Sequence, residues 1–322
     1  MEAKNAFGIR AKQLISKYKM VFVLLGIVVI LSLVSDVFLT QKNIINILRQ
    51  ISINGVLAIG VTFVIITGGI DLTVGSLVAL SAVLATSIVQ ANTESVWLAI
   101  VVGLVSGTLI GLLSGAIIAI CSVPPFIMTL AMQTICRGAA LIYTNGRPVT
   151  GLGEKFAVIG QGSLLGIPIP ILIFLGCTVV ATVILSCTRF GRHVFAIGGN
   201  AEAAKVSGIH TKGVTMTVYA ISGLACGIAG LIMASRINAG QPASGEGYEL
   251  DAIAAAVIGG TSLSGGVGSI VGTVIGVLII GVINNGMNLM SVSSYWQEVV
   301  KGLIIAITVI LDIYSSKRRT KI

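Results

Sequence analysis

The chain has 322 residues, of which 55% are hydrophobic and only 31 are charged, 20 basic plus 11 acidic. A water-soluble domain of this size carries several times more charge, so the composition excludes one and indicates a membrane protein. The formal net charge of +9 could suggest a nucleic-acid partner, but the basic residues lie at the chain ends and in one loop. No aromatic residues are interleaved with them, so we expect no nucleic-acid binding and interpret them as determinants of membrane topology.

Long stretches without charged residues predict about ten transmembrane helices, which form a single all-α membrane domain over residues 1–322. The first is the apolar run Met20–Val34, which follows five basic residues. No small-residue cleavage site follows it, so we interpret it as an uncleaved span. The other spans are expected, in chain order, in 50–70, 72–93, 95–136 (two, with a turn at Pro124 and Pro125), 156–188, 213–235, 252–297 (two, broken near 263–268) and 299–313.

Basic residues are distributed unevenly between the two sides that ten spans define. The side with both termini and the loop 188–213 carries thirteen, five in residues 1–19, four in the loop and four in residues 314–322. The opposite side carries five. Because basic residues concentrate on the cytoplasmic side of membrane proteins, we expect the N-terminus, the loop and the C-terminal tail to be cytoplasmic.

One segment and its near-repeat interrupt the apolar pattern. Residues 68–76 (GGIDLTVGS) place paired glycines and Asp71 where two apolar stretches meet, which predicts a break between helices. Asp71 either has a function inside the membrane, where an acid is costly, or caps the helix that follows. Residues 259–269 (GGTSLSGGVGS) repeat the pattern in the same predicted orientation. Either this similarity is local, or one of the two segments does not cross the membrane completely.

A polar loop between the two apolar halves contains a short predicted helix. Asn200 can cap its first turn, alanines favour helix over 201–207, and Gly208 can end it in a left-handed turn. At ~1.5 Å per residue the helix is ~10 Å long, far too short to cross a bilayer. It is either a plain connector or a docking element for a soluble partner.

Glycines recur at every fourth position along one predicted span, at 103, 107, 111 and 115. A stripe of small residues allows the backbone of a neighbouring helix to approach closely. We interpret these four glycines as a packing surface.

Polar side chains within the predicted spans are the only hydrogen-bonding groups available to a polar cargo that crosses the bilayer. Such side chains also serve simply to link helices, which is the competing interpretation. The candidates for a translocation pathway are Asn54, Thr67, Asp71, Asn284, Asn285 and Asn288. On the outer side, one exposed acidic patch is expected from Glu246, Glu249 and Asp251.

The sequence contains no Gly-x-x-x-x-Gly-Lys-Ser/Thr phosphate loop, no Ser-His-Asp or Cys-His constellation and no paired spacing of metal ligands. We therefore expect no ATP hydrolysis by this chain, no metal site and no cofactor of its own. The chain is not expected to be an enzyme.

Several motifs together resemble the membrane permease subunit of bacterial ATP-binding-cassette (ABC) sugar importers. They lie at residues 66–77, 143–146, 198–204, 207–209, 247–255, 259–263, 284–289 and 292–295. The resemblance implies a multi-pass permease of the bacterial cytoplasmic membrane, surrounded by lipid and paired with a second copy of itself. It also implies a cytoplasmic ATP-binding subunit, which holds ATP and Mg, and an extracytoplasmic sugar-binding protein.

The resemblance also implies roles for individual residues. Glu202, Ala203, Ala204 and Gly208 match the core of the "EAA" loop by which ABC import permeases contact their ATPases, although no Ile-x-Leu-Pro follows. The implied ATPase-coupling residues are Gly199, Asn200, Glu202, Ala203, Ala204 and Gly208. The acidic patch is expected to dock the sugar-binding protein by pairing with its basic side chains.

The cargo implied is a pentose, with ribose first, moved into the cytoplasm by the partner's ATP. Another pentose, a hexose or a sugar-like signal molecule are alternatives with the same fold. An ion-coupled secondary transporter is an alternative of a different class, and it would rely on charge pairs inside the membrane. Only Asp71 and Arg137 are candidates for such a pair, and this class leaves the short helix without a role. A purely structural scaffold does not explain the polar break at 68–76.

Overall fold

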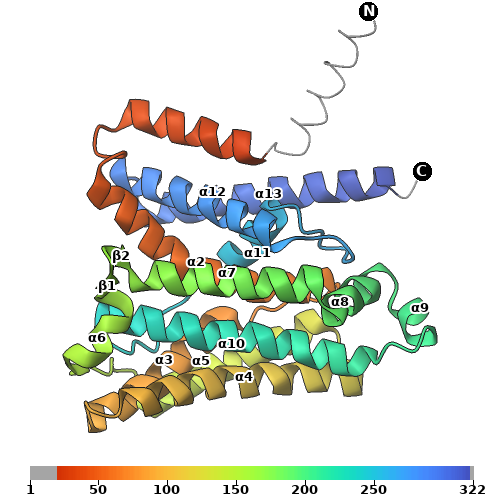
Figure 1. Cartoon of the computed structure of the whole chain (residues 1–322), viewed down its shortest axis with the longest axis horizontal. Coiled ribbons are helices and arrows are strands. Elements are labelled where there is room, and N and C mark those ends of the chain that lie inside the picture. The colour runs from red at the N-terminus through yellow and green to blue at the C-terminus, as the bar shows by residue number, and fades with distance from the viewer. Residues whose placement is uncertain (1–19, 320–322) are drawn as a thin grey trace, which may run out of the picture.

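The computed structural model of the chain describes residues 20–319. Most of its helices lie along one long axis of the molecule (Figure 1). A first helix, Met20–Val34, precedes the labelled elements. These are α2 (Gln41–Ile66), α3 (Val74–Ala91), α4 (Val96–Cys121), α5 (Pro125–Thr144), α6 (Gly153–Gln161), β1 (Ser163–Leu164), β2 (Ile167–Pro168), α7 (Ile169–Cys187), α8 (Arg189–Gly199), α9 (Ala201–Val206), α10 (Thr211–Ile237), α11 (Tyr248–Ile258), α12 (Ile270–Leu289) and α13 (Ser294–Arg319).

Seven helices of the described chain are long and apolar enough to cross a membrane, namely α2, α3, α4, α5, α7, α10 and α12. The prediction of an all-α, multi-pass membrane protein is confirmed. The predicted turn at Pro124 and Pro125 is also confirmed, because Pro125 begins α5, where its missing N–H costs no helical hydrogen bond.

The prediction of about ten spans counts α11 as a helix that crosses the membrane, and for this helix the prediction is wrong. α11 has 11 residues, which rise ~1.5 Å each and so cover only about half of a hydrocarbon core ~30 Å thick. The window 252–297 therefore contains one spanning helix, α12, and one short helix. The start of α2 was also misplaced: Thr40 caps it, accepting from the N–H of Asn43 at 3.4 Å, so the helix begins nine residues before position 50.

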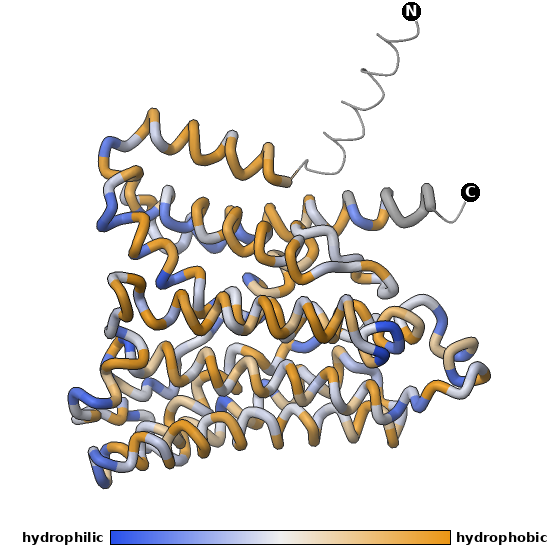
Figure 2. The backbone as a smooth tube through the Cα atoms, viewed as in Figure 1, coloured by the Kyte–Doolittle hydropathy of each residue, from blue (hydrophilic) through white to orange (hydrophobic). Residues whose placement is uncertain are grey.

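The two ends of the helical bundle differ. The antiparallel hairpin of β1 and β2 lies with α6 at one end, which we call the hairpin end (left in Figure 1). The helices α8 and α9 lie at the opposite end, which we call the α9 end; the described part of α13 ends towards it. Hydrophilic residues gather mainly at these two ends, and the helices between them are largely apolar (Figure 2).

The glycine stripe of α4 packs directly against α10, as predicted. A side chain at Gly107 would meet the backbone of Gly223 and Gly227, and one at Gly111 would meet the backbone of Tyr219 and Gly223. The backbones of α4 and α10 therefore touch, with glycine on both sides of the contact.

Both predicted breaks are present. Residues 67–73 separate α2 from α3, and residues 259–269 separate α11 from α12. Each begins with a glycine pair that includes a left-handed residue, Gly68 (φ +79°) in the first and Gly260 (φ +94°) in the second. Both α2 and α11 run into their breaks in the same direction, and α11 is the copy that does not cross completely.

The two breaks meet at the α9 end. The N–H of Gly266, in the second break, donates to the carbonyl oxygen of Ile66 at the end of α2, at 2.8 Å. Gly198, near the end of α8, lies so close that a side chain there would collide with both of these backbone groups. We call Ile66, Gly198 and Gly266 the junction, because it joins α8 to the end of α2 and to the second break.

Candidate functional site

The short helix α11 begins inside the bundle, beside the first turn of α3. A side chain at Gly75 of α3 would meet the carbonyl oxygen of Gly245 and the carboxylate of Glu249. The chain that leads into α11 is held by Arg137 of α5, which donates to the carbonyl oxygens of Pro242 (2.6 Å) and Ser244 (2.8 Å). Non-helical backbone is tolerated at such a depth only where protein partners satisfy it, and these contacts do so.

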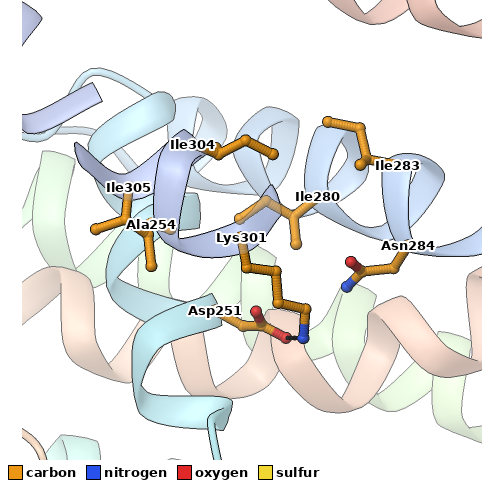
Figure 3. Close-up of a pocket in the computed structure, with 8 residues that line it drawn as sticks. All are labelled: Asp251, Ala254, Ile280, Ile283, Asn284, Lys301, Ile304 and Ile305. Atoms are coloured by element: carbon orange, nitrogen blue, oxygen red, sulfur yellow. Dashed lines mark hydrogen bonds and ion pairs between the residues drawn. The ribbon is translucent and has the colours of Figure 1, made fainter. Parts of the chain in front are cut away.

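The first turn of α11 carries two acids, Glu249 and Asp251. The free N–H groups of a helix N-terminus favour negative charge nearby. The Asp251 carboxylate also accepts from the Nζ of Lys301 in α13 at 3.1 Å (Figure 3). It accepts as well from the Nδ2 of Asn54 in α2 at 3.4 Å. Asp251 is only 4% exposed, whereas the Lys301 side chain is 32% exposed, so the carboxylate is the buried member of the ion pair.

Asn284 of α12 completes what we call the Asp251 cluster: Asn54, Asp251, Asn284 and Lys301. Its side-chain oxygen is buried and accepts no hydrogen bond from any described residue. Its amide points into a small cavity that Asp251 and Lys301 also line (Figure 3). The cavity measures about 10 Å³, about the space that one water molecule needs, and its other walls are apolar. The cavity is therefore too small to hold a sugar molecule in the described conformation.

Of the six predicted pathway residues, the structure brings Asn54 and Asn284 together in this cluster. Asp71 lies elsewhere, buried at 2% exposure, and accepts from the N–H of Thr73 (3.0 Å), the hydroxyl of Thr73 and the hydroxyl of Ser222 (2.7 Å). These contacts hold the turn before α3 and link it to α10; Thr73, not Asp71, is the N-cap of α3, and no described side chain caps its first amides.

The other three predicted pathway residues hydrogen-bond within or between helices. Asn285 exchanges two amide hydrogen bonds with Asn43 of α2, at 3.0 and 2.9 Å. Asn288 accepts from the Nε2 of Gln297 at 2.9 Å, and Thr67 donates to the carbonyl oxygen of Val64 at 2.7 Å. None of the three lines the cavity beside Asp251.

The expectation of one exposed acidic patch is wrong. Only Glu246 is exposed, whereas Glu249 and Asp251 are 8% and 4% exposed. The reason is that α11 enters the bundle: Glu249 turns towards α5, where Gln133 donates to it at 3.3 Å, and Asp251 turns towards α13. Glu246 alone remains available to a partner protein.

The predicted short helix is present as α9, at the end of the molecule. The side-chain oxygen of Asn200 accepts from the N–H of Ala203 at 2.9 Å, and Gly208 follows the helix with φ +84°. Glu202 is exposed, while Ala204 is buried. Sequence reasoning missed the amphipathic helix α8 before it, whose Gly191, Val194 and Ile197 are buried.

Lys301 is the main residue of the site that sequence reasoning missed. A basic residue inside an otherwise apolar window was a usable signal, since such a residue needs a partner. The pair Asp71 and Arg137, proposed from the sequence, is not formed. Among the described residues the two ion pairs are Lys301 with Asp251 and, on the surface, Lys155 with Glu94.

The fold and the site define a polytopic permease, whose short helix is exposed at one end and whose polar cluster lies within the bundle. A family model described as "Branched-chain amino acid transport system / permease component" matches residues 43–309. The chain belongs to this family, and it is a transport subunit, not an enzyme.

Curated relatives are similar along nearly the whole chain. The ribose import permease protein of Bacillus subtilis (strain 168) is 50% identical, over 89% of each chain. That of Escherichia coli (strain K12) is 45% identical, over 94% of this chain and 95% of its own. The L-arabinose ABC transporter permease protein of Azospirillum brasilense is 39% identical, over 95% of this chain and 90% of its own. No solved structure matches the chain significantly.

Proposed function

We propose that this chain is the membrane-spanning subunit of an ABC importer that carries ribose into the cytoplasm, driven by ATP on a partner subunit. The observation that carries the proposal is the 50% identity to a ribose import permease across 89% of both chains. Identity to the L-arabinose permeases is lower, at 39%. The alternative cargo is therefore another pentose, L-arabinose first.

The geometry of α9 supports a partner ATPase. α9 is a capped, exposed two-turn helix at one end of the bundle, so it can transmit a displacement of a bound ATPase to the rest of the chain. A flexible loop in its place would deform instead. The connection of α9 through α8 to the junction gives such a displacement a route to the end of α2 and to the second break. The coupling residues proposed are Gly199, Asn200, Glu202, Ala203, Ala204 and Gly208, and ATP and Mg belong to the partner.

The orientation proposed puts the α9 end in the cytoplasm. The support is the thirteen basic residues on that predicted side against five on the other. The hairpin end then faces outward and is the proposed docking side for the sugar-binding protein. Glu246, the one exposed residue of the predicted acidic patch, follows Gly245 in the segment that leads into α11. The membrane proposed is the bacterial cytoplasmic membrane.

A second copy of the permease is the remaining proposed partner. The apolar faces of α4 and α7 are extensively exposed, with 22% of their most hydrophobic windows buried inside one chain. In the membrane such faces contact lipid or another helix of an assembly.

Reconstitution tests the proposed function. The chain is placed in vesicles with its ATP-binding subunit and sugar-binding protein, and labelled ribose, L-arabinose and L-leucine are offered separately. We expect concentrative uptake of ribose that requires ATP and both partners, and none by the chain alone. Preference for L-arabinose or L-leucine would reassign the cargo, and ion-driven accumulation by the pure chain would establish the secondary-transporter alternative instead.

A further inference from the structure

The Asp251 cluster holds an ion pair and an unsatisfied acceptor beside two small cavities, both of which Asp251 and Asn284 line, with Lys301 at the first and Asn54 at the second. Asp251, Asn54 and Asn284 come from three different helices, and Lys301 comes from a fourth. The oxygen of Asn284 is buried without a hydrogen-bond donor among the described residues, although Asn284 is only 5% exposed. A buried polar atom in this state is costly, and its cost is removed when a ligand donates to it.

We infer that the Asp251–Lys301 ion pair closes the transport pathway, and that hydroxyl groups of a passing neutral sugar replace it. This inference rests on the proposed function and names the groups that handle its cargo. A hydroxyl group both donates and accepts, so neighbouring hydroxyls of one sugar can donate to Asp251 and accept from Lys301 at the same time. The amides of Asn54 and Asn284 extend the same set of donors and acceptors.

The charge balance of the cluster favours a neutral ligand. A single anion would pair with Lys301 and leave the buried Asp251 carboxylate uncompensated, and a single cation on Asp251 would release Lys301, which is 32% exposed, from its partner. A neutral polyol satisfies both members and leaves both charges in place. The apolar walls of the cavity, which include Ile280, Ile283 and Ile304, suit the carbon–hydrogen face of a sugar ring.

Among the described residues, the ion pair is also one of three polar ties between α13 and the α11–α12 segment, and the third joins Gln297 to Asn288. The second tie is Asp312 of α13, which accepts from the hydroxyl of Ser262 (3.2 Å) and the N–H of Leu263 (3.1 Å) in the second break. The second break also includes Gly266 of the junction, so a displacement of α8 can move the end of α11. Asp312 remains hydrogen-bonded to Ser262 and Leu263 of that break during the displacement. The Lys301 contact at the opposite end of α11 is then the one that must separate.

The first test removes both charges together, so that no lone charge is left buried. The variant Asp251→Asn with Lys301→Gln keeps side-chain size and hydrogen bonding. The matched control is Glu94→Gln with Lys155→Gln, which neutralises the exposed ion pair. Each complex is purified with its ATPase, so that only assembled transporters are compared.

We expect the cluster variant to hydrolyse ATP without moving sugar, so that ribose imported per ATP falls about tenfold, within the range of couplings between distant sites. The control should keep the wild-type ratio. A purely structural ion pair would lower the yield of assembled complex and leave this ratio unchanged, and that result would overturn the inference.

The second test measures whether sugar reaches the cluster. Asn284→Cys is introduced into a chain whose five native cysteines are replaced, and its labelling by a charged thiol reagent is followed during turnover. Ribose at ten times its Kd for the Asp251 cluster should slow the labelling of the cysteine at position 284 about tenfold, because it then occupies the cluster about ten-elevenths of the time. Asn285→Cys is the matched control, because the neighbouring residue faces Asn43 instead. It should react slowly in every condition.

Three outcomes are decisive for the inference. Equal labelling of the Asn284→Cys variant with and without ribose overturns it, and so does protection by L-leucine in place of ribose, because a zwitterion would then be the ligand. Protection by ribose supports it. If the wild-type complex fails to import ribose at all, the proposed function fails first, and that failure is seen before any variant is made.

Discussion

At the scale of single residues, two buried carboxylates that look alike in the sequence have different surroundings. Asp71 is surrounded by neutral donors, the backbone and hydroxyl of Thr73 and the hydroxyl of Ser222. Asp251 is paired with the cation of Lys301 and lines a cavity. The first arrangement is complete without a ligand, and the second is not. Stability and transport should therefore respond differently to changes at the two sites.

Asp71→Asn should destabilise the permease and leave transport by the surviving complex within about twofold of normal. The amide turns one acceptor oxygen into a donor that faces either Thr73 or Ser222, which costs about 1–3 kcal/mol for a buried group left without its hydrogen bond. The midpoint of thermal unfolding in detergent measures the effect, and Asp36→Asn, at an exposed aspartate, is the control. Normal stability with lost transport would instead assign Asp71 to the pathway.

At the scale of elements, the junction is where three segments far apart in the sequence touch through their backbones. The ends of α2 and α8 and the second break meet there, with Gly198 between the other two. Backbone contact leaves no flexible side chain to absorb a displacement. The distance between α8 and both breaks is therefore fixed more tightly than side-chain packing alone would allow.

Gly198→Ala should uncouple the transporter. The added methyl group collides with the carbonyl oxygen of Ile66 and the N–H of Gly266, which separates α8 from the breaks; overpacking of this kind costs about 1–3 kcal/mol. We expect ribose imported per ATP to fall several-fold in assembled complexes. Gly138→Ala is the matched control, because a side chain there meets no atom within 4 Å. An unchanged ratio in the Gly198 variant would show that the junction only holds the fold together.

At the scale of the whole molecule, local features could be predicted and distant pairs could not. Both breaks and the capped helix α9 are each encoded within about ten consecutive residues, by glycines and a capping asparagine. The pairs Lys301–Asp251 and Asn43–Asn285 join positions 50 and 242 residues apart, and no local pattern indicates them. The predicted helix bounds are wrong where a charged residue is taken as the end of a span. α2, for example, continues through Arg49. A long basic side chain near a helix end can reach water, so a charge does not by itself end a helix.

The α4–α10 contact should not tolerate an added side chain. Gly107→Val would push the backbones apart where Gly223 and Gly227 now touch α4, which costs at least about 1–3 kcal/mol because no side chain can move away. We expect a lower unfolding midpoint and less assembled complex. Gly176→Val on α7 is the control, since its added side chain meets nothing within 4 Å. Equal midpoints for the two variants would contradict the packing role.

The same contact sets a condition on how the protein is made. Gly107 and Gly223 lie 116 residues apart, so at ~5–20 residues per second the ribosome completes the second about 6–23 s after the first. During that interval α4 must remain in the bilayer without its partner. Its high hydropathy permits this, because a helix that is apolar on every side is stable in lipid before it packs against another helix. When α10 is inserted, it packs against α4 and fixes the position of that helix. If synthesis stops before α10, α4 stays inserted in the membrane without this partner.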